Sequence, residues 1–187
     1  MKGTCTIALL RGINIAGHNI IKMEALREIC ISLKLREVRT YVQSGNIVFQ
    51  TDENDLLKLA KRIEDAIERG HGFRPPVICR TTAEMKAAAG RNPFAKRADL
   101  DPSKLAVCFL AHEPSNMARA RLLQIQAEPE ELRIGRYELF IYFPNGMGRP
   151  KLSMAAVERA VQTPMTSRNW NTVTKLIEMA DEIEATG

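Results

Sequence analysis

The sequence has 187 residues, enough for one domain or two small ones, and its 45% hydrophobic and 26% charged residues are typical of a globular protein. This composition argues against intrinsic disorder, collagen-like sequence and membrane-spanning segments. The excess of Lys and Arg (27) over Asp and Glu (22) gives a net charge of +5, which suits an anionic partner without requiring one.

The first part of the chain alternates strand and helix patterns. β-Branched and apolar runs predict strands, and apolar residues at helical spacing predict helices. In chain order we predict a strand at 4–10, a Gly- and Asn-rich loop at 12–19, a helix at 23–33, a hairpin of strands 38–42 and 47–49 around Ser44-Gly45-Asn46, a helix at 56–67 and a strand at 77–80. The order is β-α-β-β-α-β.

The same order returns in the second part, after a short helix at 83–89 and a break at Asn92-Pro93. The predicted elements are a strand at 105–110, a helix at 117–125, a hairpin of 131–134 and 137–143 around Gly135, a helix at 154–161, a short strand at 165–167 and a last helix carrying apolar residues from 173 to 183. The repeat concerns element order only, because the two halves show no residue-by-residue match.

We therefore predict an α+β fold of two tandem ferredoxin-like β-α-β-β-α-β units with a C-terminal helix. The first unit spans residues 1–81, and residues 82–102 form a linker with a short helix. The second unit with the C-terminal helix spans residues 103–187.

This topology brings particular loops together. The first and second strands of each unit run in the same direction, as do the third and fourth, so their carboxyl ends share an edge of the sheet. In the first unit we expect residues 11–22 to lie beside residues 43–46, and we call this the first loop edge. In the second unit we expect residues 145–151 to lie beside residues 166–170, which we call the second loop edge.

Helix starts distinguish these edges from the rest of the chain, because unpaired amides and the helix dipole there attract negative charge. Two predicted helices have such starts neutralised by the protein itself. Acidic residues at 52–55 precede the helix at 56–67, and Glu113 and Ser115 precede the helix at 117–125. The stretches leading from Arg11 and from Asn145 to the next helix contain no acid, and they add Lys22, Arg149 and Lys151. An external anion would be favoured there, although turn-forming glycines and solvated basic side chains would give the same pattern.

Other motifs are weaker. Gly12 and Gly17 approach the spacing of a phosphate-binding loop, but His18 and Asn19 stand where that loop needs Lys and Ser or Thr, so we predict no nucleotide hydrolysis. Ser-Gly-Asn at 44–46 is ordinary hairpin chemistry, whereas Gln43 has no turn role. The first strand has no aromatic residue and the third only Phe49, so base stacking on the sheet is not expected.

Nothing in the sequence pairs a nucleophile with a base, so catalytic residues and enzymatic activity stay unassigned. The four cysteines lie far apart, without zinc-ligand spacing, and are interpreted as buried, reduced thiols. The apolar run at 5–10 is too short to cross a membrane and has no cleavage signature. We predict a cytoplasmic protein with no metal, no cofactor and no membrane partner.

Four strings carry a resemblance to a known family. They are Leu9-Leu10-Arg11-Gly12-Ile13-Asn14, Thr40-Tyr41-Val42-Gln43-Ser44-Gly45-Asn46-Ile47-Val48-Phe49, Asn92-Pro93-Phe94 and Arg168-Asn169-Trp170-Asn171-Thr172-Val173-Thr174-Lys175-Leu176. Over nearly the whole chain the sequence resembles the family called domain of unknown function 1697. The resemblance implies a bacterial cytosolic protein of two ferredoxin-like halves and no established activity. The family pattern has Gly-Lys-Asn where this chain has Gly17-His18-Asn19, whereas Lys22 matches.

The hypothesis from these observations is a protein that binds a phosphate-bearing or other anionic ligand, a small molecule such as a nucleotide or a nucleic-acid backbone. Two alternatives stay open: an enzyme acting on a small acidic metabolite in a cleft between the halves, and a structural module whose exposed sheets pair into a homodimer. The candidate ligand-binding residues are Arg11, Gly12, Asn14, His18, Lys22, Gln43, Ser44, Asn46, Asn145, Arg149, Lys151, Arg168 and Asn169.

Overall fold

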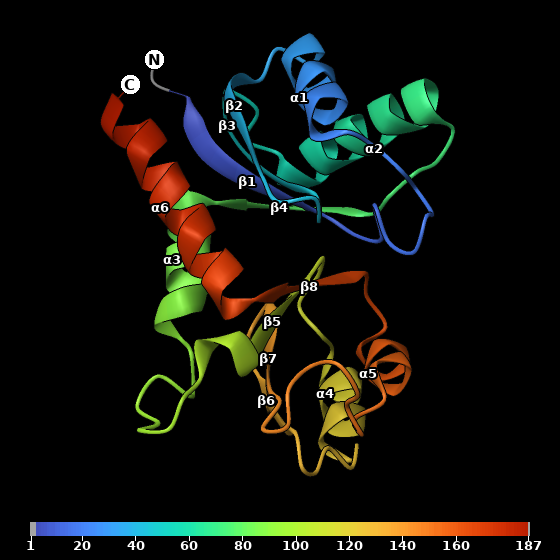
Figure 1. Ribbon diagram of the computed structural model, residues 1–187, viewed down its shortest axis with the longest axis vertical. Helices are drawn as coiled ribbons and strands as arrows, with labels where there is room; N and C mark the ends of the chain where they lie inside the picture. The colour runs from blue at the N-terminus through green and yellow to red at the C-terminus, as the bar shows by residue number, and fades with distance from the viewer. Residues whose placement is uncertain (1–2, 187) are drawn as a thin grey trace. The chain divides into compact units, whose positions relative to one another are not determined.

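In the computed structural model, which describes residues 3–186, strands and helices alternate along the chain as the hydrophobic pattern predicts (Figure 1). The first part contains β1 (Thr4–Leu10), α1 (Met23–Ser32), β2 (Arg36–Tyr41), β3 (Asn46–Thr51), α2 (Leu56–His71), β4 (Val77–Thr81) and α3 (Thr82–Gly90). The second part contains a 3-10 turn η1 (Pro102–Lys104), β5 (Leu105–Leu110), α4 (Asn116–Leu123), β6 (Glu131–Ile134), β7 (Glu138–Tyr142), α5 (Met154–Val161), β8 (Met165–Asn169) and α6 (Trp170–Thr186).

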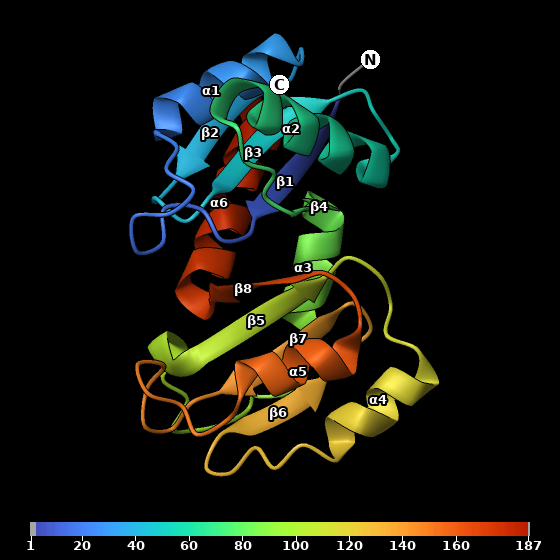
Figure 2. The same cartoon turned by 90° about the vertical axis from the view of Figure 1, so that its right-hand side faces the viewer.

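The strands form two four-stranded antiparallel sheets, with orders β2-β3-β1-β4 and β6-β7-β5-β8 (Figure 2). This is the strand order of the ferredoxin-like arrangement in both cases, and the α+β prediction of two β-α-β-β-α-β units with a C-terminal helix is confirmed. Because β1 and β2 are both antiparallel to β3, they run in the same direction and end at the same edge.

By its contacts the chain divides into two units. Unit 1 comprises the residues up to Lys86 and again those from Lys175 on, and unit 2 comprises Ala87–Thr174. The boundaries thus fall inside α3 and α6. Sequence patterns alone assigned the whole C-terminal helix to the second half, whereas the greater part of α6 is grouped with the first.

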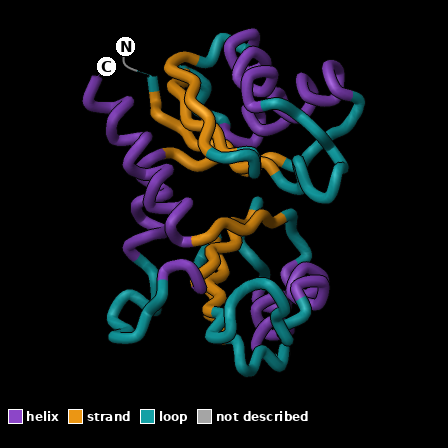
Figure 3. Tube along the Cα trace, viewed as in Figure 1, coloured by secondary structure: helices purple, strands orange, loops and turns teal. Residues whose placement is uncertain are grey.

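In unit 1 each face of the sheet is covered (Figure 3). On one face, Ala8, Leu10 and Phe49 pack with buried residues of α1 and α2, among them Leu26 and Ile63. This core forms because β-strand side chains alternate between faces, and each helix turns an apolar stripe toward the sheet.

On the opposite face of the same sheet lie α6 and the start of α3. The buried thiol of Cys5 donates to the carbonyl oxygen of Ala180 (3.7 Å). Arg39 of β2 pairs with Glu182 (2.9 Å), and the hydroxyl of Thr82 donates to Cys5 O (3.4 Å). The C-terminal residues therefore complete unit 1.

In unit 2 the helices α4 and α5 cover one face of the sheet, with Cys108, Leu139 and Ile141 in the core between them. The segment after α3 lies on the opposite face. There the ring of Phe94 lies 5.9 Å from that of Tyr142, and the guanidinium of Arg91 pairs with the buried carboxylate of Glu138 (2.9 Å).

No helix within residues 3–186 has both the length and the apolar character needed to cross a lipid bilayer.

Candidate functional site

The first loop edge is assembled as the topology predicts. The amide of Leu10, at the end of β1, donates to Gly45 O (2.8 Å) in the β2–β3 hairpin. A few residues on, Asn14 Nδ2 donates to Gln43 O (2.9 Å). The loop after β1 and the turn of the hairpin therefore form one continuous surface.

The loop after β1 is itself a small hairpin. Ile15 and His18 form a bridge, with the amide of His18 donating to Ile15 O (2.9 Å). Ala16 and Gly17 between them have φ angles of 49° and 81°, as a type I′ turn requires. The turn accounts for Gly17, so the spacing from Gly12 to Gly17 is explained without a phosphate-binding loop.

Asn14 ties this hairpin to its surroundings. Its Nδ2 donates to Ile21 O (3.0 Å) as well as to Gln43 O, and its Oδ1 accepts from the amide of Ile21 (2.9 Å). Asn19 Nδ2 donates to Gly12 O (2.9 Å). These two asparagine side chains thus hold the loop together.

The turn of the β2–β3 hairpin uses its polar residues in the same way. Asn46 is buried, and its Nδ2 donates to Tyr41 O and to Ser44 Oγ, both at 2.9 Å. Gly45 has a φ of 77°, and a Cβ atom there would lie 2.7 Å from side-chain atoms of Leu10 and Ile13. Sequence reasoning named Ser44 and Asn46 as ligand contacts, and the bonds recorded for them build the turn.

Three candidate side chains of the first loop edge project into solvent. His18, Lys22 and Gln43 are exposed, and within residues 3–186 none of their side chains makes a recorded hydrogen bond or ion pair. Arg11 is half-buried and does have partners. The first loop edge therefore offers cationic and amide groups around a rigid hairpin.

The start of α1 differs in part from expectation. Lys22 occupies the N-cap and provides no side-chain hydrogen bond, so the first turn lacks an internal side-chain cap. The loop contains no acid and the helix begins at Met23, both as predicted, but Glu24 lies in the first turn of the helix. This carboxylate offsets part of the positive potential of the helix end.

The second loop edge is also assembled as predicted. Lys104 Nζ donates to Pro144 O (2.9 Å), just after β7, and Asn169 Nδ2 at the end of β8 donates to Ser103 O (2.8 Å). Both contacts meet at the start of β5, so the ends of β7 and β8 share one edge.

The amides leading into α5 are occupied, however, and the expectation that they stay available to a ligand is wrong. The buried carboxylate of Glu130 accepts from the amide of Leu152 (2.9 Å) and, at 3.4 Å, from that of Lys151. Ser153 Oγ accepts from the amide of Ala156 (3.2 Å). The acid is absent from the stretch before the helix because it comes from the loop before β6. The side chains of Asn145, Arg149 and Lys151 remain exposed.

Arg168 and Asn169 are parts of the sheet and of the next helix start. Arg168 is buried, and burial lowers the pKa of its guanidinium to about 10. Its Nη1 donates to Thr166 Oγ1 and Ser167 O, both at 2.8 Å. Asn169 Oδ1 accepts from the amide of Asn171 (2.9 Å) at the start of α6.

The starts of α2 and α4 are capped from within as predicted, by Asp55 and Ser115, whereas Glu113 pairs with Arg119 and Arg136. Asp55 accepts from the amides of Leu57 (3.1 Å) and Lys58 (3.0 Å), and Ser115 Oγ accepts from that of Ala118 (3.1 Å). Within residues 3–186, no group of three or more His, Cys, Asp or Glu is arranged to hold a metal ion.

Comparison with known proteins yields a family and a fold. The family model described as a protein of unknown function, DUF1697, matches residues 4–140. No curated protein matches the chain. Among solved structures, the conserved bacterial protein SP0830 from Streptococcus pneumoniae is similar, with a TM-score of 0.70 and 23% identity over 95% of this chain and 98% of that chain. At this identity the likeness concerns the fold alone.

Proposed function

The chain belongs to the DUF1697 family of proteins of unknown function, and from the geometry of unit 1 we propose that it binds a phosphate-bearing anion, a nucleotide or the backbone of a nucleic acid. The site is the first loop edge. Its contacts are the side chains of Arg11, His18, Lys22 and Gln43, while Asn14 holds the two loops in place.

The observation that carries this proposal is the set of hydrogen bonds made by the side chain of Asn14. One side chain makes three hydrogen bonds that join the loop after β1 to Ile21 and to Gln43 O. A loop that is ordered before binding does not lose that conformational entropy when a ligand arrives. Residues 11–22 and 43–46 contain no carboxylate, although Ile15 and Ile20 are exposed beside the cationic and amide groups.

The start of α1 adds to the attraction, because its first amides have no side-chain cap. Glu24 works against it. The second loop edge is left out of the proposal, since Glu130 accepts from an amide just before α5 and Ser153 from one in its first turn. That contrast selects one of the two loop edges.

The proposal is tested by fluorescence anisotropy with a labelled single-stranded DNA oligonucleotide, and with ATP as a competitor, across a salt series. Binding should weaken as salt rises, because cation–phosphate contacts release counterions. Lys22→Ala should weaken binding at every salt concentration and reduce the salt slope by about one. ATP should displace the oligonucleotide if single nucleotides share the site.

Lys96→Ala is the matched control, because Lys96 is an exposed lysine of unit 2 that also has no recorded partner. It should leave the affinity and the salt slope unchanged. Absence of binding at the lowest ionic strength, or an equal loss in Lys96→Ala and Lys22→Ala, would overturn the proposal.

A further inference from the structure

The sheet of unit 2 ends at β6, a strand that pairs only with β7. Its four residues alternate charged and apolar: Glu131, Leu132, Arg133 and Ile134. Leu132 and Ile134 pack toward the core beneath α4 and α5. Glu131 and Arg133 point to the other face, where Glu131 pairs with Arg97, and Arg133 lies 5.6 Å from the ring centroid of Phe94.

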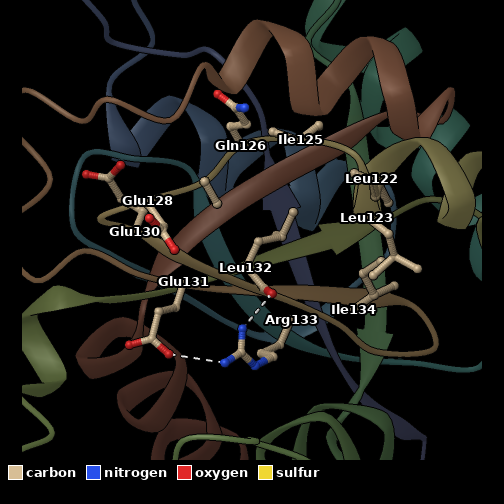
Figure 4. Close-up of a pocket in the computed structure, with 11 residues that line it drawn as sticks. Leu122, Leu123, Ile125, Gln126, Glu128, Glu130, Glu131, Leu132, Arg133 and Ile134 are labelled. Carbon is tan, nitrogen blue, oxygen red and sulfur yellow. Dashed lines mark hydrogen bonds and ion pairs between the residues drawn. The ribbon is translucent and has the colours of Figure 1, made fainter.

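An open groove lined by both apolar and charged side chains runs beside this strand (Figure 4). It has a volume of about 910 Å³ and lies between β6, the end of α4 and the segment that joins them. Leu123 at its rim is 77% exposed, the most of any large hydrophobic residue described. Its apolar lining residues are Leu122, Leu123, Ile125, Ala127, Leu132 and Ile134, and its polar ones are Gln126, Glu128, Glu130, Glu131 and Arg133.

Some backbone N–H and C=O groups of β6 point away from β7 at this edge. The amide of Gly135 donates to Glu138 O (2.7 Å), and in an antiparallel ladder such bonded pairs alternate along the strand. With the register of β6 on β7, Glu131 and Arg133 therefore bond to β7, while the N–H and C=O groups of Leu132 point outward.

We propose that the β6 edges of two copies of this chain pair antiparallel about a two-fold axis at Leu132. Leu132 would then exchange two backbone hydrogen bonds with Leu132 of the second copy. In this register Glu131 lies opposite Arg133 of the second copy, and Arg133 opposite Glu131. The strand is thus complementary in charge to itself, as an isologous interface requires.

The same axis places α4 of both copies on one face of a continuous eight-stranded sheet. Leu123 and the apolar residues of the groove would lie next to their counterparts and lose contact with water. An apolar surface beside an unpaired strand edge is stabilised by being covered in this way.

Association has to displace two contacts within the chain. The guanidinium of Arg133 donates to the outward carbonyl oxygen of Leu132 and to Glu131 Oε2, both at 3.1 Å (Figure 4). In the dimer, the amide of Leu132 from the second copy replaces the first of these contacts and Glu131 of the second copy the second. A charged side chain lying along an edge strand can also prevent that strand from pairing with another chain. The experiment therefore has to distinguish a β6 edge that pairs from one that Arg133 keeps unpaired.

The test is sedimentation equilibrium of the full chain over a range of concentrations. The wild type should form dimers. Arg133→Glu places two carboxylates opposite each other at both symmetric positions and should weaken dimerisation about tenfold or more, as should Glu131→Arg with two guanidinium groups. Mixing these two variants should restore dimers, and the double variant Glu131→Arg with Arg133→Glu should dimerise as the wild type does.

Leu123→Asp should also weaken dimerisation. Leu57→Asp, which changes another exposed helical leucine in unit 1, should not. Circular dichroism of each variant establishes that it is folded. A wild type that stays monomeric at all concentrations overturns the proposal in favour of edge protection. If Arg133→Glu and Glu131→Arg dimerise as tightly as the wild type, the proposal is overturned in favour of dimerisation through another surface.

Discussion

Thr6 carries the one buried side-chain oxygen or nitrogen within residues 3–186 that has no hydrogen-bond partner. It lies in the middle of β1, between Phe49 of β3 and Thr81 of β4. A hydroxyl group buried without a partner has lost its hydrogen bonds to water without replacement. The cost makes this position a weak point of the unit 1 core.

Replacing Thr6 by Val, which has nearly the same shape, should raise the free energy of unfolding by about 1 kcal/mol, measured by urea denaturation. Thr51→Val is the matched control. Thr51 is also buried, but its Oγ1 accepts from the amide of Glu53 (3.1 Å), so its loss should lower stability. A destabilised Thr6→Val variant would mean that the hydroxyl has a partner after all.

Two buried thiols predict how stability depends on alkaline pH. Burial raises the pKa of Cys30 and of Cys79 from 9.0 to about 12. Below pH 9 both thiols are protonated in the folded and the unfolded protein, so pH has no effect through them. Between pH 9 and 12 the unfolded chain loses these protons while the folded protein keeps them, so the free energy of unfolding falls as pH rises.

Urea denaturation across this pH range should therefore show that the free energy of unfolding falls as pH rises. The fall should be smaller in the double variant Cys30→Ala/Cys79→Ala. In the folded protein at pH 8 both thiols should react with a maleimide only as fast as the protein opens. Rapid labelling without unfolding would contradict the burial on which this prediction depends.

Among the elements, the contact between the loop after β1 and the β2–β3 hairpin depends on two glycines in different ways. Gly45 and Gly17 both have positive φ angles, 77° and 81°. A Cβ atom at Gly45 would collide with Leu10 and Ile13, whereas nothing lies within 4 Å of one at Gly17.

Gly45→Ala should therefore destabilise the protein by about 2 kcal/mol or more, because strain and overpacking add. Gly17→Ala should cost only about 1 kcal/mol, the penalty of a left-handed alanine. Thermal unfolding of the two variants measures the difference. Equal losses would mean that the hairpin can move away from the loop at no cost.

Elements with a local signal were predictable from the sequence. The strand at 105–110 and the helix at 154–161 have the predicted ends, because apolar periodicity and a capping serine are local features. The meeting of loops at each edge followed from strand direction alone. Contacts between distant residues were not predictable: nothing in the sequence near α5 indicates that Glu130 accepts a hydrogen bond from the amide of Leu152, just before the helix.

The candidate residues illustrate the same division. Asn and Gly next to basic residues indicate a ligand loop and a tight turn equally well, because both use polar side chains near strained backbone. The hydrogen bonds in the structure show that Asn14 and Asn46 build the loops, whereas the side chain of Lys22 projects from them. Solvent exposure of a side chain is a tertiary property.

For the whole molecule, the greatest difference from expectation concerns α6. Its amphipathic pattern is clear in the sequence, but the pattern does not specify which sheet the apolar stripe covers. Its residues from Lys175 on belong to unit 1, where Leu176, Ala180 and Ile183 are buried. The strand β1 presents Cys5 to this helix.

A chain that ends at Thr174 should therefore lose the fold of unit 1, because one face of its sheet becomes exposed to water. Binding of the dye ANS and a lowered melting temperature measure this loss. A chain that ends at Glu184 keeps every buried residue of α6 and should behave as the full protein does. A truncated chain ending at Thr174 with an unchanged melting temperature would contradict the role given to α6.

Because α6 packs on the first sheet, it also determines when unit 1 can be completed during synthesis. The ribosome releases the chain from its N-terminus, and domains generally fold as they emerge. Every residue of unit 2 is therefore made before the last turns of α6. The first sheet, although it is made first, thus receives its last covering helix only after unit 2 has been made.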